Sequence, residues 1–473
     1  MSEAIAEMVL PGTYIEVRSE GLIGVGGIAT GIVGIVGTAA RGPVGEAKSV
    51  GNYAAALDLY GSPDPFQRPS ETLPLSLTRA LGHLFAGGAR DVYAVRIAHG
   101  TPTAASSDVD ATDANVGFTI AAIQLGSYGN SISYEVIDAG TTVNPRFTLT
   151  ITDGRTKETF TGNRTGEIRE AITAVGTGSK LVIATVPTAA NANRNLVPQA
   201  KTLTGGTSHP DVNAADVGSG LAVLAGQRIN IVVVAGLGAD AIAGVVGAHL
   251  EQTENDNRER IAVIGASSPG TANDASAIVS AGALNDDRIV LVTPGISEID
   301  AETNQPFSLP PASMAAVVAG KLATLAPHVS LTNKTVPVVT DITYDTAVVK
   351  ALLNTNVLVV RRKLGYQIVR GISSEPGAFQ QISVRRIVDY AKAGVRMGCD
   401  PYIGKLNNSR VRGALKATLD GFLSQMVVDE MLTAYDLDVS ATRSEEINGI
   451  ARVTMTLQPT FSIDFIRVTM TLQ

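Results

Sequence analysis

The sequence closes on a repeated strand-forming segment. The string Arg-Val-Thr-Met-Thr-Leu-Gln occupies residues 452–458 and again residues 467–473. In both copies Val, Met and Leu alternate with polar residues, which is the period of a strand with one apolar and one polar face. Pro459 follows the first copy and cannot donate a hydrogen bond to a strand ladder, so it favours two separate strands. The second copy is therefore an apolar terminal strand that needs a partner.

Two arrangements would give this terminal strand a partner: a hairpin within its own domain, or pairing with a neighbouring subunit. Residues 9–17 form a second short extended segment, which contains a Pro-Gly pair and precedes a glycine-rich stretch. Strand-forming segments near both ends favour polymerisation through exchanged strands. We expect residues 453–457 to stay in their own domain. The residues expected in the inter-subunit arms are Tyr14, Ile15, Val17, Val468, Met470 and Leu472.

The composition is typical of a protein that buries much of its surface. A chain of 473 residues is long enough for two to four domains. Only 17% of the residues are charged and the mean hydropathy is +0.19, which fits extensive burial, including burial against other subunits. The single cysteine, Cys399, excludes an intrachain disulfide, and we expect it to be an ordinary thiol.

Basic residues are concentrated in one region, although the net charge is −7. Residues 1–349 contain 21 Lys and Arg against 33 Asp and Glu, whereas residues 350–420 contain 13 against 4. This regional excess argues against a general nucleic-acid binder and favours one basic face that contacts an acidic partner.

A long helix predicted from residue 409 to about residue 432 carries part of this basic excess. Arg410, Arg412 and Lys416 lie in its first turns and two acidic residues, Asp429 and Glu430, in its last, opposite to the preference of the helix dipole. Because helix stability does not explain this arrangement, the three basic residues are candidates for a docking surface. A solvated basic face is the alternative.

Residues 21–40 contain no charged residue and have the length of a membrane span. Seven of them are glycine, and the preceding segment is acidic and lacks the basic start of a signal peptide. We therefore expect no membrane insertion and a protein that is made and kept in the cytoplasm.

Apolar runs alternate with helical patterns over two parts of the chain. This alternation predicts a mostly parallel sheet covered by helices. The predicted strands are residues 30–38, 92–97, 229–235, 261–264 and 289–292, and the predicted helices are residues 52–60, 73–85, 239–252, 274–281 and 311–326. Between them, residues 101–207 are rich in Thr, Ser, Asn and Ala and contain short alternating runs, which indicates a β-rich insertion.

The fold predicted from these patterns is a multidomain α/β protein with strand arms at both ends. Residues 336–466 combine helices at 346–353, 384–395 and 409–432 with short strands, which indicates an α+β domain. The expected organisation is an N-terminal arm (1–20), an α/β core (21–100 with 208–335), an inserted all-β outer domain (101–207), an α+β C-terminal inner domain (336–466) and a C-terminal arm (467–473).

No motif for catalysis or cofactor binding stands out. The sequence lacks a phosphate-binding loop and a Gly-x-Ser-x-Gly nucleophile motif, and none of its five histidines is spaced for metal binding. Gly236 and Gly238 follow a predicted strand as part of a dinucleotide fingerprint, but Ala241 stands at the third glycine position. We therefore predict no enzymatic activity, no cofactor and no metal.

Five short segments follow one another along the chain: Pro-Gly-Thr-Tyr-Ile-Glu at residues 11–16, a glycine-rich run at 31–43, residues 53–61, Val-Arg-Arg at 384–386, and residues 459–466. In this order they resemble the contractile tail sheath proteins of bacteriophages and related injection systems. The resemblance implies an α/β core, a β-rich outer domain, and a C-terminal domain whose small sheet accepts the arms of neighbouring subunits.

The same resemblance implies a structural protein of a virion tail sheath, assembled in the cytoplasm of the bacterial host. Hexameric rings would stack around an inner tube, with Arg410, Arg412 and Lys416 facing that tube. Contraction would drive the tube through a target envelope for genome ejection and would need no nucleotide. The implied partners are further copies of the chain, the inner tail tube protein, and the baseplate and tail terminator proteins, with no direct nucleic-acid contact.

Two other functions remain open at this stage. One is an α/β enzyme with a β accessory domain, using the Gly236 region for a cofactor, and the other is a different self-assembling shell protein. The resemblance itself covers phages, bacteriocins and other injection systems alike.

Overall fold

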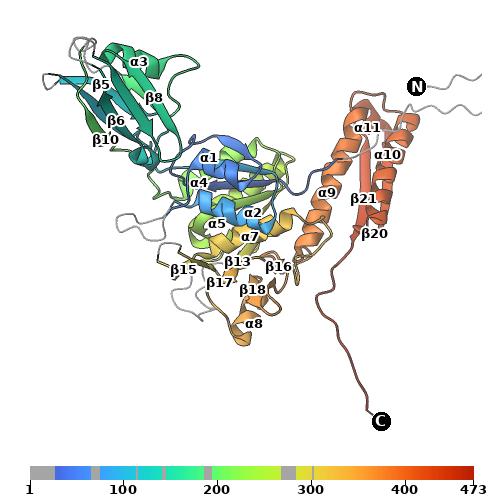
Figure 1. Ribbon diagram of the computed structural model, residues 1–473. Coiled ribbons are helices and arrows are strands. Elements are labelled where there is room, and N and C mark those ends of the chain that lie inside the picture. Colours follow the sequence, from blue (N-terminus) through green and yellow to red (C-terminus); the bar gives the residue numbers. More distant parts are fainter. Residues whose placement is uncertain are drawn as a thin grey trace, which may run out of the picture. The chain divides into compact units, whose positions relative to one another are not determined.

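The computed structural model describes residues 27–64, 75–112, 115–140, 145–185, 194–267, 284–300 and 303–472 (Figure 1). The helix predicted at residues 274–281 lies outside these ranges. The described residues divide into two compact units. The C-terminal unit consists of residues 27–30, 325–330 and 377–472, and the larger unit consists of residues 31–324 and 331–376.

The larger unit is built on a nine-stranded sheet in the order β16-β19-β18-β13-β12-β11-β1-β3-β2. Its strands from β3 to β18 are parallel, and β2, β19 and β16 are antiparallel to their neighbours. The strand bounds are β1 (Val33–Gly37), β2 (Ala47–Val50), β3 (Val92–Arg96), β11 (Ile231–Gly238), β12 (Ile261–Gly265), β13 (Ile289–Thr293), β16 (Thr335–Val336), β18 (Leu358–Arg362) and β19 (Tyr366–Ile368). Strands β1, β12 and β13 are uninterrupted apolar runs and are buried throughout, as expected when helices cover both faces.

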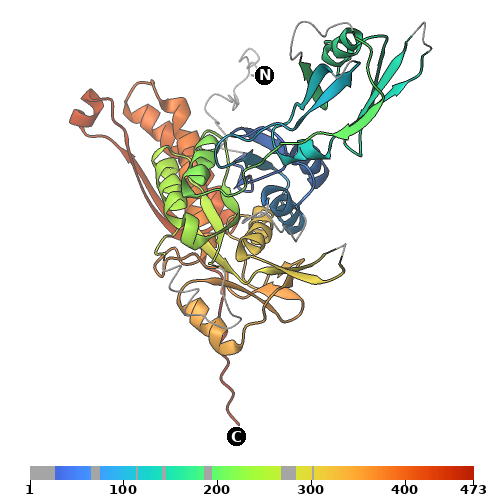
Figure 2. The same ribbon diagram turned by 90° about the vertical axis from the view of Figure 1, so that its left-hand side faces the viewer.

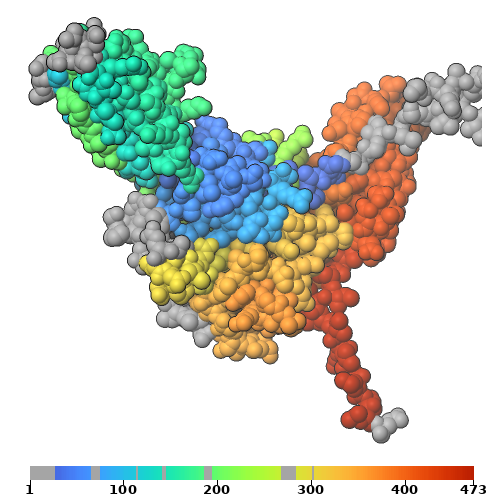
Figure 3. Space-filling model, viewed as in Figure 1, coloured from blue at the N-terminus to red at the C-terminus, as the bar shows by residue number. Residues whose placement is uncertain are grey.

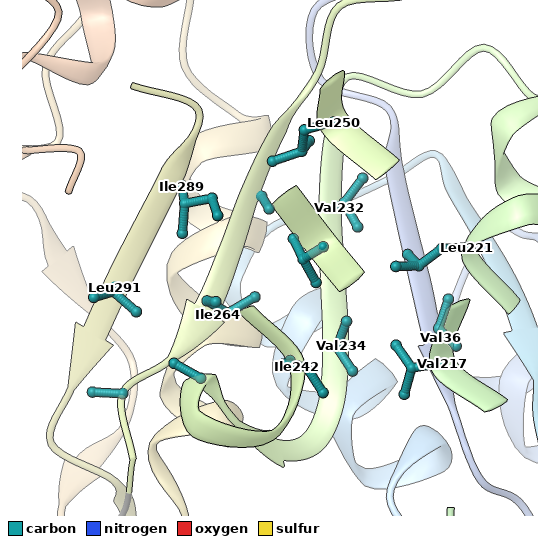
Figure 4. Packing of buried hydrophobic residues seen from close by; sticks show 14 of the residues in the cluster. Val36, Val217, Leu221, Val232, Val234, Ile242, Leu250, Ile264, Ile289 and Leu291 are labelled. Atoms are coloured by element: carbon teal, nitrogen blue, oxygen red, sulfur yellow. The ribbon is translucent and has the colours of Figure 1, made fainter. Parts of the chain in front are cut away.

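Helices of the larger unit pack against this sheet. They are α1 (Tyr53–Tyr60), α2 (Leu77–Gly87), α4 (Ala214–Ala225), α5 (Ala239–Asn255), α7 (Pro311–Ala323) and α8 (Thr346–Asn354). Figure 4 shows Val217 and Leu221 of α4 and Ile242 and Leu250 of α5 packed against one face of the sheet. Helix α4, absent from the sequence prediction, covers the parallel strands at the place where the chain re-enters the core.

Helix α7 covers the opposite face. Ile264 of β12 points toward α4 and α5, so its neighbour Gly265 points the other way. A Cβ atom at Gly265 would lie 2.1 Å from the backbone nitrogen of Ala312, the second residue of α7. Glycine at residue 265 therefore lets α7 lie directly on the sheet.

Strands β16, β18 and β19 also belong to this nine-stranded sheet. Thr335 and Val336 of β16 pair with β19, which pairs with β18, which lies parallel to β13. The sequence predicts a C-terminal domain over residues 336–466, whereas residues 331–376 group with the larger unit in the structure. A three-stranded sheet of β14 (Ile296–Ile299), β15 (Pro306–Leu309) and β17 (Val339–Thr340) completes this part of the chain.

Residues 106–202 form two antiparallel sheets around a core of their own, cyan to green in Figure 2. One sheet contains β4 (Ser106–Ala111), β5 (Asn115–Ala122) and β9 (Val182–Thr185), and the other contains β10 (Gln199–Thr202), β6 (Ser133–Asp138), β7 (Phe147–Thr152) and β8 (Lys157–Gly162). Helix α3 (Thr165–Thr173) packs with them. Phe118, Leu149 and Ile151 are fully buried between these elements. The mixed α/β class with several sheets, predicted from the sequence, is confirmed.

The C-terminal unit packs two helices against a two-stranded sheet. Its elements are α9 (Ile382–Cys399), α10 (Ser409–Val428), β20 (Leu432–Ser440), α11 (Arg443–Ile447) and β21 (Arg452–Pro459). Leu419, Phe422 and Met426 of α10 form the core of the unit with Ile387 and Ala391 of α9. Among the described residues, no helix is long and apolar enough to cross a membrane.

The structure corrects the predicted end of the long helix. Helix α10 ends at Val428 instead of residue 432, because Glu430 adopts a left-handed backbone conformation with φ 61° and the Met431 amide donates to the carbonyl of Met426. Strand β20, absent from the sequence prediction, begins directly after this turn.

Candidate assembly site

Strands β20 and β21 form an antiparallel sheet with one apolar face. Leu437 pairs with Met455, and Val439 pairs with Val453. Val453, Met455 and Leu457 pack against the core cluster of α9 and α10, while the threonines between them are exposed. Residues 453–457, the first copy of the repeat, thus pair within their own domain, and this prediction is confirmed.

The sheet has two edges without a strand in the described part of the chain, because β20 and β21 pair only with each other. Every second N–H and C=O group of an edge strand points away from its partner and is available for a further strand. A two-stranded sheet is also close to the limit of independent stability. The β20–β21 sheet is therefore suited to accept strands from another chain.

The second copy of the repeat has no regular structure up to Leu472. Figure 3 shows it as a single extended chain, drawn in dark red. Val468, Met470 and Leu472 are 71, 87 and 98% exposed, whereas the matching residues of the first copy are half-buried. Because the two copies are identical, the difference in burial follows from the presence or absence of a partner sheet.

The predicted N-terminal arm residues Tyr14, Ile15 and Val17 lie outside the described residues. The described chain begins at residue 27 in the C-terminal unit, where Ile28 packs against the core cluster of α9 and α10. The carbonyl of Thr30 then accepts a hydrogen bond from Arg386 at 3.1 Å. Both terminal segments therefore leave from the same unit as the β20–β21 sheet.

The three basic residues of α10 have different surroundings. Arg410 and Lys416 are exposed. Arg412 forms an ion pair with Glu446 at 3.0 Å and donates to the Asn407 side chain at 2.8 Å, which leaves 15% of its side chain exposed. The structure thus presents Arg410 and Lys416 to solvent and directs Arg412 toward α11.

The two acidic residues predicted for the last turn of α10, Asp429 and Glu430, lie outside the helix. Asp429 follows the last helical residue and accepts a hydrogen bond from Gln425, and Glu430 forms the turn that leads to β20. In α10, therefore, only the basic residues of the first turns oppose the helix dipole.

The described residues contain no group of three or more His, Cys, Asp and Glu side chains placed to hold a metal ion. The glycines at 236 and 238 lie at the end of β11, and a Cβ atom at Gly236 would lie 2.6 Å from the Cβ of Ser76. Glycine at 236 therefore allows close approach of the segment before α2. Burial raises the pKa of the Cys399 thiol, as does the nearby Asp400, so the thiolate is disfavoured.

The family model for the phage tail sheath C-terminal domain matches residues 374–473. This range contains the β20–β21 sheet, helices α9 and α10 and both copies of the repeat. The search of curated protein sequences gave no match.

Solved sheath structures have a similar fold. The sheath tail protein of Desulfitobacterium hafniense aligns with a TM-score of 0.66 and 15% identity over 95% of this chain and 100% of its own. The sheath tail protein Lin1278 of Listeria innocua aligns with a TM-score of 0.63 and 14% identity over 92 and 93%. The contracted helical sheath of the anti-feeding prophage aligns with a TM-score of 0.56 and 14% identity over 98 and 99%. Together these matches confirm the resemblance to contractile tail sheath proteins.

Proposed function

We propose that this chain, whose fold is that of tail sheath proteins, is the structural subunit of a contractile sheath. Subunits would polymerise around an inner tube, remain linked by exchanged strands, and rearrange their contacts to drive the tube through a target envelope. The observation that carries the proposal is the repeat: one copy is paired as β21 in a two-stranded sheet whose outer edges have no strand in the described chain, and the identical copy is exposed.

The arm, residues 467–473, suits a sheet like its own. Its apolar residues have the spacing that in β21 places Val453, Met455 and Leu457 against the helices. A donated arm would therefore bury Val468, Met470 and Leu472 in the same manner on another subunit. Strand addition at an open edge uses backbone hydrogen bonds for affinity and alternate side chains for specificity.

A single exchanged arm is a weak link. Burying its three apolar side chains contributes roughly 1.5–3 kcal/mol each, and about six new backbone hydrogen bonds contribute about 0.5–1.5 kcal/mol each. Ordering seven residues costs about 1–2 kcal/mol each, so the terms cancel to within a few kcal/mol. Many such links in one lattice would hold subunits together while leaving them free to rotate.

The proposed partners follow from this role. Copies of the chain would form stacked hexameric rings, a baseplate would trigger contraction, and a terminator protein would close the sheath. Structures with this fold come from a contracted helical sheath and from a baseplate. The work of contraction would come from subunit contacts, so the proposed role needs neither a catalytic residue nor a nucleotide. Assembly would take place in the cytoplasm of the bacterial host.

Two further assignments belong to the proposal. Arg410 and Lys416 would contact an acidic surface of the inner tube, with Arg412 holding the first turns of α10 in place through Glu446. Residues 101–207 would form an outward-facing module, and Tyr14, Ile15 and Val17 would pair with a neighbouring subunit as the N-terminal arm.

The test changes the apolar side of the arm and leaves its length intact. Val468, Met470 and Leu472 are replaced by Asp together, and the matched control replaces Thr469 and Thr471 by Asp. We expect the first variant to remain a folded monomer by circular dichroism and sedimentation, with no tubes or rings in electron micrographs. The control should assemble. Normal tubes from the first variant would show that the arm is not exchanged.

A further inference from the structure

The side chain of Gln381, just before α9, pairs with the chain that leads to the arm. Its Oε1 accepts a hydrogen bond from the Ser462 amide at 3.0 Å, and its Nε2 donates to the Ser462 carbonyl at 3.1 Å. Nε2 also lies 3.3 Å from the Asp464 carboxylate. Accepting from the N–H and donating to the C=O of one residue is what a neighbouring strand does in an antiparallel ladder. Gln381 thus takes the place of a strand at this position.

This contact extends the pairing of β21 beyond its last residue. The Thr460 amide donates to the carbonyl of Met431 at 3.0 Å, which continues the ladder with β20 by one bond. Ser462 is then held by Gln381. The connecting segment, residues 460–466, is therefore fixed over its first part and exposed at Phe465 and Ile466.

Arg386, in the second turn of α9, makes a similar set of backbone contacts. Its guanidinium donates to the carbonyls of Thr30 at 3.1 Å, Leu325 at 2.9 Å and Ala326 at 3.3 Å, and its side chain is buried. Thr30 is the fourth described residue and the last one before the chain passes from the C-terminal unit to the larger unit. Arg386 therefore holds the chain that follows the N-terminal segment, just as Gln381 holds the chain that precedes the C-terminal arm.

The two contacts lie five residues apart, a rise of about 7.5 Å along the helix axis. Gln381 and Arg386 both form hydrogen bonds with backbone atoms, so these hydrogen bonds do not depend on which side chains the held segments carry. An α-helix of this length is rigid compared with an extended segment. A displacement of one held segment would thus be passed to the other through the first turns of α9.

We propose that Gln381 and Arg386 anchor the roots of the two exchanged arms, so that the first turns of α9 couple the links which one subunit makes with its neighbours. This proposal rests on the strand exchange of the proposed function. The partner that binds each arm, and so exerts force on the residue that holds it, is a second copy of this chain.

The anchor at Ser462 limits how far the arm can reach. From Ser462 the extended chain spans about 17 Å to residue 467, whereas from Thr460 it spans about 24 Å. Loss of the hydrogen bonds between Gln381 and Ser462 would let the arm move from Thr460 instead of Ser462. The volume that the arm can reach would then increase about threefold, and its effective concentration at a neighbouring sheet would fall by the same factor.

The experiment compares Gln381→Met with Gln252→Met in the full chain. Methionine keeps the length of glutamine but has no amide, and Gln252 is an exposed glutamine of α5, a helix of the larger unit. In the unassembled protein, we expect faster hydrogen exchange of the peptide 460–466 for Gln381→Met only. The protein concentration needed for tube formation should rise about threefold for the same variant.

Each outcome decides one part of the proposal. Unchanged exchange of residues 460–466 in Gln381→Met would overturn the anchor itself. Faster exchange with tubes forming at the concentration of the unmodified protein would overturn its role in assembly. For Arg386, the conservative Arg386→Lys variant keeps the charge but not the three donor contacts, and it should speed exchange near residue 30. The exchange measurement uses the unassembled chain, so it stands or fails independently of whether the arm is exchanged.

Discussion

Arg412 and Glu446 form an ion pair 3.0 Å long that joins α10 to α11. Glu446 also accepts from Arg443 at 3.1 Å, and these hydrogen bonds hold the pKa of Glu446 below its ordinary value. One of the three basic residues assigned to a partner thus has an acidic partner within its own unit. The remaining two, Arg410 and Lys416, carry the predictions for tube binding.

Reversing both exposed charges, Arg410→Glu with Lys416→Glu, should weaken binding to the inner tube protein severalfold at low salt, with a smaller difference at high salt because exposed charges are screened. Co-sedimentation with tubes across a salt series measures this. The charge-matched control, Lys157→Glu with Lys180→Glu, changes exposed residues of the β-rich insertion and should bind normally. Equal binding by both variants would remove Arg410 and Lys416 from the interface.

The close contact of α9 with α10 predicts a pair of opposite glycine effects. A Cβ atom at Gly394 would lie 2.0 Å from Cζ of Phe422, so Gly394→Ala should destabilise the C-terminal unit by about 1–3 kcal/mol through overpacking. Gly421 has no atom within 4 Å of such a Cβ, so Gly421→Ala should stabilise α10 by about 1 kcal/mol. Chemical denaturation measures both, and equal effects of the two changes would contradict the packing described.

His249 should make stability depend on pH. Burial, and then the charge of Arg260, lower the pKa of His249 to about 4, and its Nε2 lies 3.2 Å from Nη1 of Arg260. Between about pH 6.5 and pH 4 the unfolded chain binds a proton that the folded chain does not. Stability should therefore fall by up to about 1.4 kcal/mol per pH unit as the pH is lowered through this range.

The comparison variant for this effect is His249→Gln, which keeps an acceptor for Arg260 and does not titrate. The free energy of unfolding, measured from pH 7 to pH 4, should decline less steeply for the variant than for the unmodified protein. Identical slopes would mean that His249 is protonated in the folded state.

The β-rich insertion can be removed at a defined point. Thr103 and Thr207 pair through two backbone hydrogen bonds of 3.2 and 3.3 Å, so the segments that enter and leave the insertion lie side by side. Replacing residues 104–206 by a short Gly-Ser linker should leave a folded core that still assembles. Circular dichroism and electron microscopy test this, and a folded variant without tubes would contradict the assignment of the insertion as an outward module.

Elements buried on both faces were the most predictable from sequence. Strands β1, β12 and β13 are apolar runs bounded by turn residues, and this pattern predicted them closely. Helix α4 was missed, although Asn213 and Asp216 form a capping box at its start, a signal visible in the sequence. Strand β20 was missed because its alternation follows a strong helical pattern without a glycine or proline between them.

The surroundings of the site residues were less predictable than the elements. The pairing of Arg412 with Glu446 joins residues 34 positions apart, and nothing local in the sequence indicates it. The same holds for Gln381 and Ser462, which are 81 positions apart. Such contacts depend on how α9, α10 and the β20–β21 sheet pack together, and periodicity reports only which side of each element is apolar.

The hydrogen bonds between Gln381 and Ser462 also limit which copy of the repeat can lie beside β20 in its own subunit. To replace β21 beside β20, the second copy would have to begin at the far end of that strand, about 24 Å back from Pro459. The chain from Ser462 to residue 467 spans only about 17 Å, and Ser462 lies beyond Pro459 along the chain. A subunit thus cannot displace its own strand with its own arm. While Gln381 holds Ser462, the second copy cannot reach this position in its own subunit, so the two copies can share one sequence without the second replacing the first.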